Sequence, residues 1–287
     1  PAGFPVIDSS VMPGNEAAMH DNHQPKLDLV VIGNGMAGLR VIEDLLEIAP
    51  ERYNIIVFGA EPHASYNRIM LSPVLAGDKA FADIQIHDRR WYEANGITLY
   101  TGEAVATIDR RRRMVISAEG REVGYDRLVL ATGSRPFIIP VPGHDRPGVI
   151  SFRDITDVDD MVKASENGGK AVVIGGGLLG LEAAYGLHKR GMDVTIVHLM
   201  DQLMERQLDP AAAALLQHSL AQRGLSFRMG AETAAITGDD AGHVNGLRFK
   251  DADDSTLDAD LVVMAVGIRP NIDLAKASGL HCDKGIV

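Results

Sequence analysis

The chain has 287 residues, of which 46% are apolar and 23% are charged, and these proportions are ordinary for a globular protein of two domains. A formal net charge of −11 argues against a nucleic-acid partner, because phosphate binding needs a basic face. No apolar run approaches the roughly 20 residues that span a membrane. The single cysteine, Cys282, excludes an internal disulfide and a redox-active cysteine pair, and the histidines lack the spacing of metal ligands.

The first 24 residues are polar, and they lack the basic start and the apolar core of a secretory signal. We therefore predict that residues 1–24 form a disordered extension of a cytoplasmic protein, in which Met19 is a candidate for the natural start.

The first ordered pattern predicts a strand, a tight turn and a helix. Residues 27–32 are an apolar run, apolar residues follow at helical spacing at 37, 41, 45 and 48, and a β-branched run over 53–58 predicts a second strand. Between the first strand and the helix lies Gly33-Asn34-Gly35-Met36-Ala37-Gly38, which fits the dinucleotide fingerprint G-x-G-x-x-G. This βαβ unit is typical of a Rossmann-like domain.

The glycines of this fingerprint suit a bound pyrophosphate. Gly33 permits the tight turn, Gly35 lets the backbone approach the phosphates, and Gly38 lets the helix pack closely on the strand. The helix N-terminus then faces the phosphate charge. Glu61 lies just beyond the second strand, where a carboxylate can accept the hydroxyls of an adenosine ribose. A purely structural glycine turn is the alternative for one fingerprint taken alone.

The same pattern returns later in the chain. Residues 171–174 and 192–197 predict two more strands. Between them lies Gly175-Gly176-Gly177-Leu178-Leu179-Gly180, followed by a helix whose apolar face is Leu181, Ala184 and Leu187. Two complete matches in one chain are improbable by chance, so they imply two dinucleotides, between which electrons pass.

Two side chains near the second fingerprint bear on its cofactor. Glu182 lies in the first turn of the predicted helix, where it is either a carboxylate favoured by the helix dipole or a catalytic group beside a nicotinamide. His198 stands at the strand end where a ribose-binding acid is usual, and the first arginine beyond it that could serve a 2′-phosphate is Arg206. The sequence therefore favours NADH over NADPH.

A strand and a glycine turn end each unit. Residues 125–130 predict a strand that runs into Ala131-Thr132-Gly133, and residues 259–264 predict one that runs into Ala265-Val266-Gly267. Prolines at 136, 140, 142 and 147 mark a connector after the first of these turns. We expect an α/β fold with two dinucleotide-binding domains, over 25–148 and 149–268.

These motifs together resemble the pyridine nucleotide-disulfide oxidoreductase superfamily, in the branch without a redox disulfide. Both fingerprints and both glycine turns match its pattern across residues 27–287. Within it, the stretches 61–73 and 185–209 are most similar to the N-terminal region of the large subunits of NAD(P)H-dependent nitrite reductases.

The resemblance implies that FAD binds in the first domain and NADH or NADPH in the second, which is inserted in the first. Residues 269–287 would begin a return to the FAD domain that is cut short here. The resemblance also implies cofactor contacts at Arg68 and Ser72 along the flavin and its phosphates, at the backbone of Val105 for the adenine, and at Thr132, Gly133 and Gly267.

The resemblance also narrows the class of reaction that we expect of this chain. Related ferredoxin and rubredoxin reductases often carry a lysine where this chain has Pro73. Relatives that reduce disulfides and peroxides have a cysteine in the first domain, where this chain has none. We therefore expect an FAD-dependent oxidoreductase that takes a hydride from NAD(P)H, as the NADH-oxidising module of an assimilatory-type nitrite reductase.

The electron acceptor must lie outside this chain, because one cysteine cannot ligate an iron–sulfur cluster. The resemblance implies downstream iron–sulfur and siroheme domains as partners. One alternative is a free-standing NADH-dependent rubredoxin or ferredoxin reductase with a small electron carrier. Another, of a different class, is a non-catalytic module that senses NADH. The sequence leaves the oligomeric state open.

Overall fold

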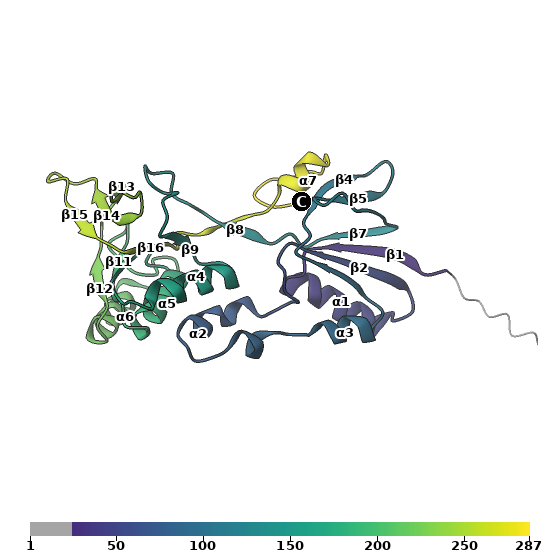
Figure 1. Cartoon of the computed structure of the whole chain (residues 1–287), viewed down its shortest axis with the longest axis horizontal. Coiled ribbons are helices and arrows are strands. Elements are labelled where there is room, and N and C mark those ends of the chain that lie inside the picture. Colours follow the sequence, from purple (N-terminus) through teal and green to yellow (C-terminus); the bar gives the residue numbers. More distant parts are fainter. Residues whose placement is uncertain (1–24) are drawn as a thin grey trace, which may run out of the picture.

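A computed structural model describes residues 25–287, and the expectation of disorder for residues 1–24 lies outside the described residues. The first part of the described chain is a parallel four-stranded sheet with the order β3-β2-β1-β7 (Figure 1). The strands of this sheet and its helices are β1 (Leu27–Ile32), α1 (Met36–Ile48), β2 (Tyr53–Gly59), α3 (Arg89–Ala94), β3 (Thr98–Thr101) and β7 (Arg127–Leu130).

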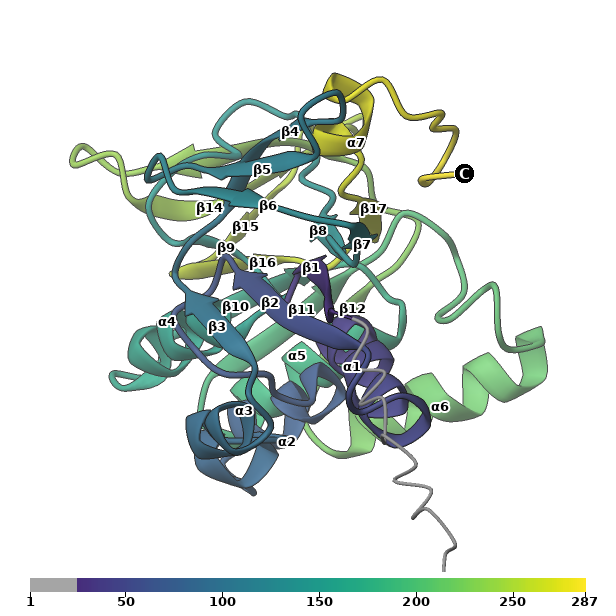
Figure 2. The same ribbon diagram turned by 90° about the vertical axis from the view of Figure 1, so that its right-hand side faces the viewer.

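The two faces of this sheet are covered differently, as Figure 2 shows. Successive side chains of a strand point to opposite faces, so Leu29 and Val31 of β1 pack with the helices, whereas Val30 and Ile32 pack against an antiparallel sheet. The strands of that sheet are β4 (Val105–Asp109), β5 (Met114–Ser117) and β6 (Glu122–Gly124). The basic run 110–113 is the turn between β4 and β5.

The second part repeats this three-layer arrangement. A parallel sheet of order β12-β11-β10-β16-β9 packs helices on one face and an antiparallel sheet on the other. The elements of its central layer are β9 (Val149–Ser151), β10 (Lys170–Ile174), β11 (Asp193–Val197), β12 (Ser226–Arg228) and β16 (Leu261–Met264). The covering elements are α4 (Ile155–Ser165), α5 (Leu178–Lys189), α6 (Pro210–Gln222), β13 (Thr233–Gly238), β14 (Val244–Phe249) and β15 (Thr256–Asp258).

An antiparallel ribbon joins the two parts (Figure 1). Its strands are β8 (Ser134–Pro136) and β17 (Ile268–Pro270), which directly follow the two predicted glycine turns. After β17 the chain forms α7 (Asp273–Ala277), which packs against β4 of the first part. The Arg110 guanidinium donates to the carbonyls of Ser278 and Gly279 just beyond this helix.

A short segment of the first part packs into the core of the second. It consists of η1 (Arg68–Met70), α2 (Leu71–Leu75) and η2 (Phe81–Ile84), which lie between β2 and α3 in sequence. Leu75 is fully buried in the core cluster that surrounds α4 and α5, and a Cβ on Gly186 would lie 2.8 Å from its Cγ. Arg190, at the end of α5, donates to the carbonyls of Val74 and Leu75. This segment therefore ties the two parts together.

The predicted α/β fold with its two βαβ units is confirmed. One detail of the first helix differs from its apolar spacing: Val41 and Ile48 are exposed, and the buried residues of α1 are Gly38, Leu39 and Ile42. The close approach of Gly38 to Gly33 fixes which face of the helix turns inward. In α5, by contrast, the predicted face is the buried one.

Candidate functional site

The first glycine turn combines two tight backbone contacts with one open position. Gly33 has φ +113°, and a Cβ on it would lie 2.1 Å from the Ala131 carbonyl oxygen. A Cβ on Gly38 would lie 2.2 Å from the oxygen of Gly33. At Gly35, the N-cap of α1, a Cβ would meet no atom within 4 Å. Gly33 and Gly38 thus serve the packing of the protein itself, and Gly35 leaves space at the start of the helix.

The second turn has the same geometry. Gly175 has φ +125°, and a Cβ on it would lie 2.3 Å from the oxygen of Ala265. A Cβ on Gly180 would lie 2.0 Å from the oxygen of Gly175, and one on Gly177 would meet nothing within 4 Å. The carbonyl oxygens of Ala131 and Ala265, in the two later glycine turns, therefore pack against the first glycine of each fingerprint. The helix N-terminus behind each open glycine carries the partial positive charge that favours a phosphate.

Two adjoining cavities, of about 290 and 330 Å³, lie along the first turn. Their volumes are of the size of ligand sites in proteins. Their shared lining residues are Gly35, Arg68, Ala131, Thr132, Gly133, Arg153 and Asn271. Of the other predicted residues, Gly33 and Glu61 line the first cavity, and Met36 and Ala37 line the second.

Gly38, Ser72 and Val105 are not among the residues that line these cavities. Gly38 acts in helix packing, as described above, and Val105 pairs with Ser117 in the antiparallel sheet. The Ser72 hydroxyl, on α2, donates to the Glu182 carboxylate, on α5, at 2.5 Å. This bond brings together two predicted site residues that are far apart in the sequence, at the junction of the two parts.

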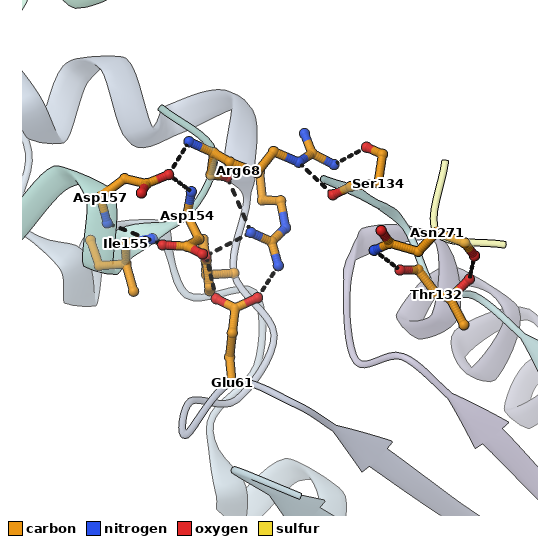
Figure 3. A network of polar contacts seen from close by, with 10 residues as sticks. Glu61, Arg68, Thr132, Ser134, Asp154, Ile155, Asp157 and Asn271 are labelled. Atoms are coloured by element: carbon orange, nitrogen blue, oxygen red, sulfur yellow. Dashed lines mark hydrogen bonds and ion pairs between the residues drawn. The ribbon is translucent and has the colours of Figure 1, made fainter. Parts of the chain in front are cut away.

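An ion pair between Glu61 and Arg68 stands in the wall of the first cavity (Figure 3). Tyr66 donates to Glu61 at 2.6 Å and accepts from Arg68 at 2.9 Å. Burial, together with the hydrogen bond to Glu61, raises the pKa of the Tyr66 hydroxyl well above its usual range, so the hydroxyl stays protonated. Arg68 also donates to the carbonyl oxygen of Arg153 at 3.2 Å. The pair therefore holds a carboxylate and a guanidinium at the cavity in a fixed arrangement.

Arg153, Asn271 and Asn34 are among the residues that line the cavities without having been predicted from the sequence. Arg153 donates to the carbonyl and the hydroxyl of Ser134, at 3.1 and 2.7 Å, and burial next to Arg68 lowers its pKa. Asn271 and Thr132 exchange two hydrogen bonds, visible in Figure 3. Asn34 lines the first cavity. Arg153 follows β9 by two residues, and the carboxyl end of a parallel strand is a place where a site residue could have been sought.

These residues fit the pyrophosphate of FAD. The first cavity offers the open start of α1 and two guanidinium groups, and the Asn34 Nδ2 on its wall is buried with no hydrogen-bond partner in the part of the chain that the structure describes. Cationic groups and unpartnered N–H donors are what a diphosphate requires.

The predicted residues of the second site gather at the carboxyl end of the second parallel sheet. His198 follows β11 and is 9% exposed, and its Nδ1 accepts a hydrogen bond from the Gly176 amide at 3.1 Å. Leu178 and Leu179 begin α5, and Glu182 follows one turn later. Gly267, with φ +120°, leads into the joining ribbon.

Within residues 25–287, no group of three or more His, Cys, Asp or Glu side chains is placed to hold a metal ion. No helix in this range has both the length and the apolar character to cross a bilayer. The Cys282 thiol is partly buried, 3.6 Å from the carbonyl oxygen of Leu280.

Two glycine turns, each opening a helix at the carboxyl end of an interior strand of a parallel sheet, define a fold of the kind that holds two dinucleotides. The family model of the pyridine nucleotide-disulphide oxidoreductases matches residues 27–287. The chain therefore belongs to this family, as its motifs predict. At the level of the family, the expected FAD and NAD(P)H are also confirmed.

Three similar proteins illustrate the relationship. "Nitrite reductase [NAD(P)H]" of Bacillus subtilis (strain 168) is 53% identical over 91% of this chain and 32% of its own length. The "Assimilatory nitrate reductase electron transfer subunit" of the same organism is 47% identical, over 91% of this chain and 34% of its own. The chain thus spans about a third of the length of these relatives. The crystal structure of a covalent putidaredoxin reductase–putidaredoxin complex matches with a TM-score of 0.85 and 31% identity, over 91% of this chain and 63% of that one.

Proposed function

We propose that this chain is the NADH-oxidising flavin module of an assimilatory-type nitrite reductase, with domains over 25–148 and 149–268. The observation that carries the proposal is the pair of matching glycine turns, each with one open glycine at the start of a helix. The relatives named for nitrite reduction support the choice of the enzyme.

In this proposal, FAD binds in the two cavities along the first glycine turn. The start of α1 at Gly35 would bind the pyrophosphate, and Arg68 and Arg153 would be the nearby cations, because both line the same cavities. FAD, when bound, takes a hydride from NAD(P)H and passes electrons on to another redox centre. Thr132 and Gly133 would border it, since both line the two cavities.

Glu182 is proposed as the catalytic residue that orients the nicotinamide. Its carboxylate is fixed at the junction of the two parts by the hydroxyl of Ser72. A carboxylate held in this way limits the positions that the nicotinamide of a cofactor bound at the second glycine turn can take, and orientation of the reacting groups is a large part of catalysis.

The test is an anaerobic titration of the FAD-loaded protein with NADH. We expect the yellow colour of the bound flavin to bleach. A flavin that remains oxidised would contradict the proposed activity and would favour the alternative of an NADH-sensing module.

A second candidate, a free-standing reductase of a small electron carrier, is supported by relatives that are named as such reductases. The "Rhodocoxin reductase" of Rhodococcus erythropolis is 32% identical over 91% of this chain and 60% of its own length. Reduction of a purified ferredoxin or rubredoxin by NADH through this chain, at a rate above that with the nitrite reductase iron–sulfur domains, would favour this candidate.

A further inference from the structure

The second site lacks an acid at the strand end, and the histidine there turns its ring inward. Because the Gly176 N–H donates to Nδ1 of His198, this nitrogen is the acceptor and the ring proton lies on Nε2. Nε2 lies 3.2 Å from Oε2 of Glu205. Both ring nitrogens are therefore engaged within the protein, and the carboxylate that contacts the side chain at the strand end belongs to Glu205.

The loop that carries Glu205 is seated on the glycine turn. The Met204 amide donates to the Gly176 carbonyl at 3.0 Å, and the Leu203 side chain is fully buried. Met204 has φ +49°, in the left-handed region that non-glycine residues seldom adopt. A strained residue of this kind is kept where the surrounding structure requires it, often at a binding site. The strain here sets the direction in which the chain presents Glu205.

We infer that Glu205 replaces the strand-end acid and accepts the hydroxyls of the adenosine ribose of NADH, with His198 as its positioning residue. This inference rests on the proposed function. His198 occupies Oε2 of the carboxylate, whereas the nearest cation to Oε1 is the Arg206 Nε, at 4.0 Å. The Glu205 side chain is 33% exposed and the Arg206 side chain beside it is 86% exposed, so a ligand can reach Oε1. The ribose hydroxyls are donors, and a carboxylate oxygen is their natural acceptor.

The surroundings of Glu205 also suit an adenosine without a 2′-phosphate. Leu199 and Met200, directly after His198, are 60% and 48% exposed, and they offer an apolar surface to the face of an adenine. A 2′-phosphate would carry negative charge towards the Glu205 carboxylate, and like charges at short range repel. The Arg206 side chain lies beside this carboxylate but is 86% exposed, so water screens its charge and it offsets the repulsion only in part. The site should therefore select NADH over NADPH through Glu205.

The test measures binding of ADP-ribose and of its 2′-phosphate to the FAD-loaded chain by calorimetry. Neither ligand carries a nicotinamide, so the measurement does not depend on electron transfer. We expect the unaltered protein to prefer ADP-ribose and Glu205→Gln to lower that preference about tenfold, because a hydrogen bond to a charged group and a charge repulsion are both lost. Asp201→Asn, in the same loop, is the matched control and should keep the preference.

His198 is tested by a double-mutant cycle. In the unaltered background His198→Ala should reduce the preference for ADP-ribose, and in the Glu205→Gln background it should add nothing further. Thermal melts of each variant show that it is folded. An unchanged preference in Glu205→Gln, or an equal loss in Asp201→Asn, would overturn the inference. Failure of the unaltered chain to bind ADP-ribose at all would overturn the proposed function instead.

Discussion

Each of the two proposed binding sites has one glycine at which a substitution can test that site alone. Within the two fingerprints, Gly35 and Gly177 are the glycines where a Cβ would meet no protein atom within 4 Å, whereas Gly33, Gly38, Gly175 and Gly180 approach backbone atoms closely. A side chain at either position should therefore leave the fold intact and obstruct only the ligand. The two open glycines form a matched pair, because they occupy the same place in two repeats.

We predict that Gly35→Val abolishes FAD binding and that Gly177→Val leaves FAD bound but prevents its reduction by NADH. The valine would fill the space through which the backbone approaches a pyrophosphate. The measurements are flavin absorbance after gel filtration and anaerobic bleaching by NADH. Each variant is the control for the other. Loss of flavin from both to the same degree would contradict the assignment of FAD to the first glycine turn and of NADH to the second.

We predict that Cys282→Ser leaves the rate of flavin reduction unchanged. Cys282 lies near the end of the described chain, does not line either cavity, and has the carbonyl of Leu280 as its contact. Its serine variant keeps the size and the hydrogen-bonding capacity of the side chain. Stopped-flow reduction by NADH measures the rate, and a fall of tenfold or more would point to a thiol mechanism.

At the scale of elements, α2 connects the two parts of the molecule. We predict that Leu75→Ala lowers the free energy of unfolding by about 2–5 kcal/mol, because Leu75 is fully buried against α5 and the change leaves a cavity. Urea denaturation, followed by circular dichroism, measures the loss. Leu215→Ala in α6 is the control, since Leu215 is 72% exposed, and it should change stability by no more than about 0.5 kcal/mol. Equal losses of unfolding free energy in the two variants would show that the packing of α2 against α5 does not stabilise the protein.

The sequence predicts the elements that depend on nearby residues and misses those that depend on distant ones. Both βαβ units follow from apolar spacing and glycine turns within about 30 residues. The docking of α2 on α5 joins residues more than 100 positions apart, as in the Ser72–Glu182 bond, and apolar spacing carries no information about it. Arg153 was not predicted for the same reason, because it belongs to the second part of the chain but lines the first cavity.

In the whole molecule, the first cavity lies where the two parts are joined. Both glycine turns follow strands of parallel sheets, and the first cavity is lined by residues of both parts, from Gly33 to Asp154 and Asn271. Ligands of such sheets bind at the carboxyl ends of the strands. Two dinucleotides bound there would thus share the junction, where Ser72 and Glu182 are hydrogen-bonded.

We expect the FAD-loaded chain to oxidise NADH with ferricyanide and to fail with nitrite, because reduction of nitrite needs a further redox centre and the 287 residues contain one cysteine. Ferricyanide takes electrons from exposed reduced flavin without a specific docking site. The two rates are followed by NADH absorbance in the same preparation, and addition of an iron–sulfur and siroheme protein from a nitrite reductase should restore the reaction with nitrite. Oxidation of NADH by nitrite with this chain alone would show that the flavin groove itself reduces nitrite.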